Sequence, residues 1–151
     1  MSACLHACPS VGDAFAQRVT FDAASIRAFA TASGDLNPLH HDEDFARRST
    51  FGTLIASGTH VGALMMGLTA THFSRRCAPL GLEFTLRFVR AVLAGTTLEL
   101  GWTLRSLTPK ASLRGDLARL QGRARDEAGI VYVEGDALLL LRPLATHGSK
   151  P

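Results

Sequence analysis

The chain is poor in cysteine and shows no pattern of a secreted or membrane-embedded protein. Its three cysteines, Cys4, Cys8 and Cys77, are an odd number and provide no disulfide framework. The first residues lack a basic segment followed by an apolar stretch, so we expect no secretory signal. The longest apolar stretch, residues 54–70, is too short and too interrupted by polar residues for a membrane span. These absences favour the reducing cytoplasm.

The sequence also lacks a concentrated charge of one sign and internal repeats. The net charge is only +3, and the arginines that supply it are scattered. A nucleic-acid-binding protein usually has a basic stripe with aromatic residues between the charges, so we expect neither a nucleic-acid partner nor a membrane partner. The mild surplus fits a small phosphorylated ligand or a solvated surface. With 151 residues, 46% of them hydrophobic, the chain has the size and composition of one folded domain.

Hydrophobic periodicity predicts helices mainly in the first half of the chain. Asp22 is a good N-cap for a helix that runs to about residue 33, where Gly34 ends it. A short helix is expected over residues 42–48. Residues 58–72 are apolar or small on every face, which is typical of a buried helix. The glycines at 62 and 67 predict that a sheet or a partner helix packs closely against it.

Alternating apolar and polar residues predict strands, one before the helices and four after them. Their expected ranges are 11–21, 82–88, 98–105, 114–125 and 130–142. A sheet of this kind needs a cover for its apolar face, and one long buried helix provides it. We therefore predict an α+β fold, a curved antiparallel β-sheet wrapped around a long central helix, over residues 11–144. Residues 1–10 are expected to form a flexible leader and residues 145–151 a flexible tail.

An unusual density of titratable groups marks the loop Asp35-Leu36-Asn37-Pro38-Leu39-His40-His41-Asp42. Pro38 forbids a regular helix and pushes the preceding Asn37 toward extended geometry. A carboxylate and an imidazole on one rigid loop can hold a water molecule and move its proton. Asp35 and His40 are therefore candidates for an acid–base pair, although Asp35 alone also suits a loop acid that binds nearby amides.

The other polar residues of this region are interpreted more simply. Asn37 is expected to brace the loop, and His41 is expected to be exposed and to point elsewhere. His40, His41, Asp42 and His60 have poor spacing for metal ligands, and we expect no metal site.

The segment from residue 31 to residue 68 resembles the signature of the MaoC-like dehydratases and R-specific enoyl-CoA hydratases. The matching residues are Ser33-Gly34-Asp35-Leu36-Asn37-Pro38-Leu39-His40, then Asp42, Phe45 and Ala46, then Phe51-Gly52-Thr53-Leu54-Ile55-Ala56-Ser57-Gly58. The strand Leu86-Arg87-Phe88-Val89-Arg90-Ala91-Val92 also resembles that family, with Ala91 where the family often has proline. Ser57 stands where many members have histidine.

This resemblance implies a single hotdog domain that forms a homodimer or a dimer-based higher oligomer. It implies a hydro-lyase that adds or removes water at the C2–C3 bond of an acyl-CoA thioester. No cofactor is expected, since coenzyme A is part of the substrate. Asp35 and His40 would be the acid–base pair, and the acyl chain would lie in a tunnel beside the central helix, near the subunit boundary.

Gly58 is the third expected catalytic residue, because it opens the central helix. Amides at a helix start are unpaired and the helix dipole is positive there, so this amide suits the thioester oxygen. Candidate contacts to the substrate are Asn37, Ser57, Thr59, His60, Arg87 and Arg90. His60 equally fits a packed helix histidine, and the two arginines would meet the phosphates of coenzyme A.

Two other functions stay open. A hotdog acyl-CoA thioesterase would use the same fold to release a free thiol, and a non-catalytic acyl-CoA binding module would bind without turnover. The Asn-Pro-x-His loop favours the hydratase over the thioesterase. Ser57 is not expected to be a nucleophile, because the Gly-x-Ser-x-Gly pattern of serine hydrolases is absent.

Overall fold

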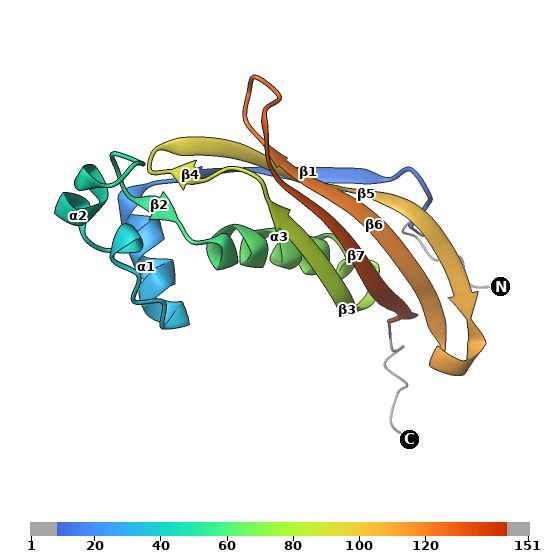
Figure 1. Cartoon of the computed structure of the whole chain (residues 1–151). Helices are drawn as coiled ribbons and strands as arrows, with labels where there is room; N and C mark the ends of the chain where they lie inside the picture. Colours follow the sequence, from blue (N-terminus) through green and yellow to red (C-terminus); the bar gives the residue numbers. More distant parts are fainter. Residues whose placement is uncertain (1–8, 145–151) are drawn as a thin grey trace.

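A five-stranded antiparallel sheet curves around one long helix in the computed structural model, which describes residues 9–144 (Figure 1). The strand order is β1-β5-β6-β7-β3. These strands are β1 (Ala14–Phe21), β3 (Cys77–Phe88), β5 (Thr96–Lys110), β6 (Gly115–Arg125) and β7 (Val131–Pro143). The predicted α+β fold of a curved sheet around a central helix is confirmed. Apart from residues 9 and 10, the expected leader and tail lie outside the described residues.

The central helix α3 (Gly58–Phe73) packs its buried side against the concave face of the sheet. Val61, Met65 and Phe73 are buried there, and the Trp102 indole of β5 donates to the Met65 carbonyl at 2.8 Å. Gly62 permits the close approach, because a Cβ at that position would lie 2.9 Å from Leu86 Cδ1 of β3. The sheet therefore explains this glycine, as expected.

The opposite side of α3 is open, which corrects the prediction of a helix buried all round. A Cβ on Gly67 would meet no described atom within 4 Å. The exposed helix residues are small or flexible: Thr59, Ala63, Met66, Gly67, Ala70 and Thr71. One sheet covers only one side of a helix, so the other side stays uncovered within residues 9–144.

Two strands are longer than predicted because each contains an irregularity that resets its alternation. The register of β3 shifts between Gly81 and Glu83, and that of β5 shifts between Leu104 and Ser106. Beyond such a shift the apolar residues change phase, so a strict period of two ends there. A short pair, β2 (Ile55–Ala56) with β4 (Val92–Leu93), was not predicted, because two residues carry no periodicity.

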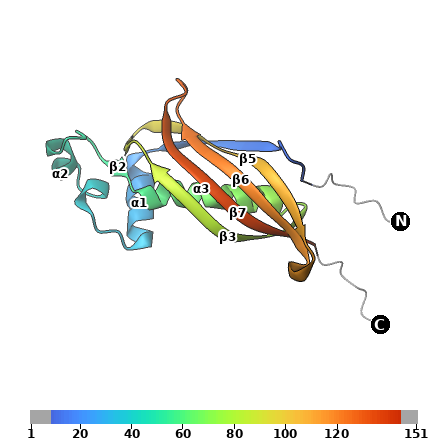
Figure 2. The same cartoon turned by 45° about the vertical axis from the view of Figure 1, so that its right-hand side comes forward.

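The expected helices before α3 are confirmed as α1 (Ala23–Ser33) and α2 (Glu43–Arg48), with a 3₁₀ turn, η1 (Pro38–His40), between them. Asp22 caps α1 by accepting from Ser25 N at 2.7 Å, and Gly34 ends it with a φ of 73°. Figures 1 and 2 both show α1, α2 and β2 gathered at one end of the sheet, around the start of α3.

Leu104 tests the core between sheet and helix, because its side chain is fully buried. We expect Leu104→Ala to lower the free energy of unfolding by about 3 kcal/mol through lost burial and a cavity. Chemical denaturation measures the change. Val11→Ala is the control, since Val11 is 63% exposed and its loss should be close to neutral. Equal losses in the two variants would contradict this description of the core.

Candidate active site

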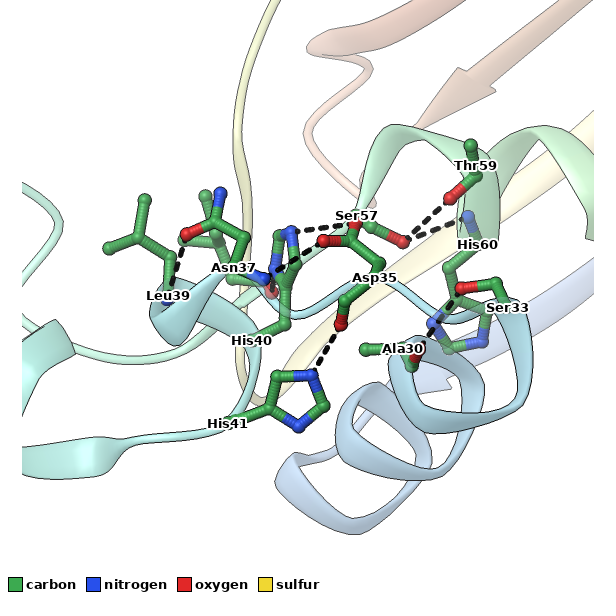
Figure 3. Close-up of polar contacts among 11 residues, drawn as sticks. Ala30, Ser33, Asp35, Asn37, Leu39, His40, His41, Ser57, Thr59 and His60 are labelled. Carbon is green, nitrogen blue, oxygen red and sulfur yellow. Dashed lines mark hydrogen bonds and ion pairs between the residues drawn. The ribbon is translucent and has the colours of Figure 1, made fainter.

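The loop after α1 holds Asp35 through its backbone and its side chain (Figure 3). Asp35 N donates to the Ala30 carbonyl at 2.9 Å, which ties the residue to the last turn of α1. Its Oδ1 accepts from Asn37 N at 3.1 Å. One carboxylate oxygen therefore serves the loop, and Oδ2 is left for other contacts.

Asn37 and Pro38 shape the turn that carries His40. Asn37 has the expected extended backbone, with φ −61° and ψ 120°, and its Oδ1 accepts from Leu39 N at 3.1 Å. Pro38 occupies the first position of η1, where its missing amide hydrogen costs nothing. The side chain of Asn37 thus braces the loop in this structure.

His40 and Asp35 are brought together, with His40 Nε2 3.4 Å from Asp35 Oδ2. His40 Nδ1 lies 2.7 Å from the Ile55 carbonyl, which can only accept, so Nδ1 carries the hydrogen. In the neutral ring Nε2 is then the proton-accepting nitrogen, and it faces the carboxylate. The His40 side chain is 6% exposed and that of Asp35 is 33% exposed, so solvent reaches the pair from one side.

The start of α3 offers hydrogen-bond donors close to this loop. Ser57 caps the helix, and its Oγ accepts from His60 N at 3.2 Å and contacts Thr59 Oγ1 at 3.0 Å. Within residues 9–144, the amides of Gly58 and Thr59 have no acceptor. The bond from His40 to Ile55 anchors the loop two residues before Ser57, and Figure 3 shows Asp35 and His40 in the region of that residue.

An apolar groove of about 790 Å³ begins at the same helix end and runs between α3 and β3. Gly58, Thr59 and Gly62 line it from the helix, and Phe84, Leu86 and Phe88 line it from the strand. A Cβ on Gly58 would lie 3.3 Å from the Phe88 ring, so glycine lets the ring lie against the helix start. An extended apolar group in this groove would end beside the Gly58 amide.

Of the expected substrate contacts at the helix start, Thr59 lines the groove, while Ser57 and His60 do not. Ser57 is buried and serves as the cap, whereas Thr59 is exposed and lines the groove. The His60 ring stacks on Phe29 with centroids 4.5 Å apart and meets the edge of Phe21 at 5.1 Å. Its Nδ1 is buried without a partner. This placement favours the packed helix histidine over contact with the substrate.

Neither of the two arginines expected at the phosphates lines the groove. Phe88 faces Gly58, and since neighbouring strand residues point to opposite faces, Arg87 points away from the groove. Arg87 is paired with Glu134 of β7. Arg90 is exposed beyond the end of β3. Contact of either arginine with coenzyme A stays a prediction.

The expectation that His41 is exposed is wrong, whereas its ring does point to a different partner from that of His40. Its ring is half-buried, and Nε2 lies 2.6 Å from the Asp35 carbonyl. A histidine beside His40 has no sequence signal for this contact, because the loop conformation decides where each ring points. Residues 9–144 contain no group of three or more His, Cys, Asp or Glu side chains placed to hold a metal ion. No helix among them is long and apolar enough to span a membrane.

A curved antiparallel sheet wrapped around one long helix defines a hotdog-fold protein. Residues 10–110 match the family model described as MaoC like domain, and the chain belongs to this family. The (R)-specific enoyl-CoA hydratase of Aeromonas caviae is 32% identical over 125 residues, which cover 80% of this chain and 87% of the relative. The 3-hydroxybutyryl-CoA dehydratase of Methylorubrum extorquens is 32% identical over 87 residues, 58% of this chain.

Solved structures agree with this assignment. The unliganded R-hydratase PhaJ1 from Pseudomonas aeruginosa superposes with a TM-score of 0.79 at 27% identity, covering 95% of this chain and 90% of that structure. The (R)-hydratase from A. caviae has a TM-score of 0.78 at 27% identity, covering 88% and 97%. Coverage of other relatives is lower, since the chain spans 55% of the M. extorquens dehydratase and 38% of a mitochondrial 3-hydroxyacyl-[acyl-carrier-protein] dehydratase of Arabidopsis thaliana.

The buried His60 predicts a loss of stability in acid. Burial lowers the pKa of His60 below its ordinary value of 6.5, with a weak opposing effect of the Asp22 carboxylate. The unfolded chain therefore binds a proton at a pH where the folded chain does not. The contribution of the neutral ring is complete above pH 6.5 and is lost as the pH falls below it.

His60→Phe keeps the stack on Phe29 and removes this titration. We expect its free energy of unfolding to fall less than that of the wild type between about pH 7.5 and about pH 5.5. Urea denaturation of both proteins at the two pH values measures the fall in the free energy of unfolding, with the higher pH as the reference for each protein. An equal fall in both proteins would show that His60 does not contribute.

Proposed function

We propose that this protein is a hydro-lyase that adds water to the C2–C3 double bond of an enoyl-CoA thioester, or removes it from the 3-hydroxyacyl-CoA. The observation that carries this proposal is the Asp35–His40 pair, with a proton-accepting nitrogen facing a carboxylate, beside the free amides that open α3. The names of the relatives support it, since they are hydratases and dehydratases of acyl thioesters.

The pair would activate the water. A water about 2.8 Å from both His40 Nε2 and Asp35 Oδ2 is compatible with their separation of 3.4 Å. As the water oxygen bonds to C3, its proton passes to Nε2, and the π electrons of C2–C3 move toward the thioester oxygen. The Asp35 carboxylate stabilises the imidazolium that forms. The proton then passes to C2, which restores the neutral ring, and the reverse sequence expels water.

The helix start would stabilise the enolate. The Gly58 amide, and the positive end of the α3 dipole, would face the thioester oxygen as negative charge develops there. One such donor contributes about 3 kcal/mol to the transition state in comparable sites. The acyl chain would occupy the groove between α3 and β3. Coenzyme A is part of the substrate, no cofactor is needed, and we propose that the protein works in the cytoplasm.

A homodimer is part of the proposal because β3 has an open edge. β3 is the last strand in the sheet order, and its Leu80 and Leu82 are 46% and 51% exposed. An apolar edge strand of this kind favours pairing with another chain. A second copy joined at β3 would also lie next to the open side of α3, so the groove would be near the subunit boundary.

Loss of the carboxylate charge tests the chemistry. We expect wild-type protein to remove the conjugated absorbance of an enoyl-CoA, and Asp35→Asn to lower kcat at least about 100-fold, since a neutral amide cannot stabilise the imidazolium. Asp44→Asn is the matched control, because Asp44 is an exposed acid of α2 paired with Arg47. A thiol reagent in the same cuvette detects thioesterase activity. Thiol release, or binding without turnover, would contradict the hydro-lyase.

A charge on the open edge tests the dimer. We expect wild-type protein to have twice the chain mass by light scattering, and Leu80→Asp to lower it, because a carboxylate would be buried in an apolar contact. Val11→Asp is the control, since Val11 is exposed and lies just before β1, the strand at the other edge of the sheet. A monomeric wild type, or an unchanged dimer in Leu80→Asp, would contradict the β3 interface.

A further inference from the structure

We propose that His41 is a positioning residue, which holds the Asp35 backbone so that the carboxylate stays in register with His40. This inference rests on the proposed function. It starts from a bond that the reaction itself does not use, in which the His41 ring reaches the Asp35 carbonyl at 2.6 Å (Figure 3). A carbonyl oxygen only accepts, so His41 Nε2 carries the hydrogen and donates it.

The bond restrains the Asp35 carbonyl oxygen, for which residues 9–144 provide no other donor. Asp35 N is bound to Ala30, and Oδ1 is bound to Asn37 N. The second bond closes a turn across the peptide group between Asp35 and Leu36, and neither bond engages the carbonyl oxygen of Asp35. Packing does not restrain it either, because Leu36 is 83% exposed. His41 therefore supplies a second restraint on this peptide, at its carbonyl oxygen, and so supports the direction of the Asp35 side chain.

His41 is itself anchored well enough to act as a support. Its backbone N donates to the Pro38 carbonyl at 3.1 Å, and its own carbonyl accepts from Arg27 Nε at 3.1 Å. Arg27 extends from α1 and is also paired with Glu43 of α2. The backbone of His41 is thus linked to α1 directly and to α2 through Arg27, while its ring contacts Asp35.

The two adjacent histidines have opposite tasks in this arrangement. His40 uses Nδ1 as a donor to Ile55 and presents Nε2 to the carboxylate, whereas His41 uses Nε2 as a donor to the backbone behind that carboxylate. A displacement of about 1 Å at a reacting group can lower a rate about 100-fold. Loss of the His41 bond should therefore reduce the rate of the chemical step and leave binding of the thioester nearly unchanged.

The test separates kcat from KM in the full-length protein with an enoyl-CoA substrate. We expect His41→Leu, which lacks a donor, to lower kcat about 10- to 100-fold and to change KM less than about threefold. His41→Gln should recover most of kcat, because its amide can donate to the Asp35 carbonyl. Asp44→Asn is the control, since Asp44 is an exposed acid of α2 that pairs with Arg47 and not with the anchor of His41, and its kcat should stay near that of the wild type.

Unchanged kcat in His41→Leu would overturn the proposal, as would a loss carried by KM or an equal loss in His41→Gln. If His41→Leu does not fold, His41→Gln and His41→Asn form the test, because only the longer glutamine reaches the carbonyl. ¹⁵N NMR of the histidines adds a readout from the resting protein, with hydrogen expected on Nε2 of His41 and on Nδ1 of His40. Inactive wild-type protein would instead refute the hydro-lyase, and the positioning role with it.

Discussion

The geometry of the candidate site, and the chemistry proposed for it, depend on the hydrogen bond from His40 Nδ1 to the Ile55 carbonyl. Since the carbonyl accepts, the bond selects the tautomer in which Nε2 is the base, and it points that nitrogen at Asp35. It also joins the loop after α1 to β2, the short strand that leads into α3. The loop that carries Asp35 and His40 is therefore joined to the segment that opens α3 by one contact between residues 15 positions apart.

The curved sheet shapes the groove between α3 and β3. Its concave face presses Leu86 and Phe88 against Gly62 and Gly58, so that the strand and the helix start form the two walls of one groove. Because the sheet covers only one side of α3, the other side and the edge of β3 are left apolar and exposed. The groove proposed for the acyl chain lies between this side of α3 and β3, so the proposed dimer would form next to it.

Much of the fold was predictable from local patterns. Asp22 and Gly34 bracket α1 because capping is decided within one turn, and the alternation in β6 and β7 reflects one wet face of a sheet. The alternation of apolar and polar residues does not predict a strand across a β-bulge, as at Leu82 of β3, because the bulge shifts which residues face the core. It also does not predict β2 and β4, because each strand has only two residues. The pattern also places the exposed side of α3 in the core, because in a sequence an apolar residue looks the same whether its side chain faces a sheet or an open groove.

The sequence by itself determined that Asp35, Asn37, Pro38 and His40 share a rigid loop, and that a glycine opens a helix downstream, since these are properties of neighbouring residues. Only the tertiary structure decided the direction of each histidine. The His40 ring contacts a carbonyl of β2, and the His41 ring contacts a carbonyl of its own loop. The His60 ring packs against two phenylalanine rings. Those partners come from the packing of segments, and a linear pattern does not contain that information.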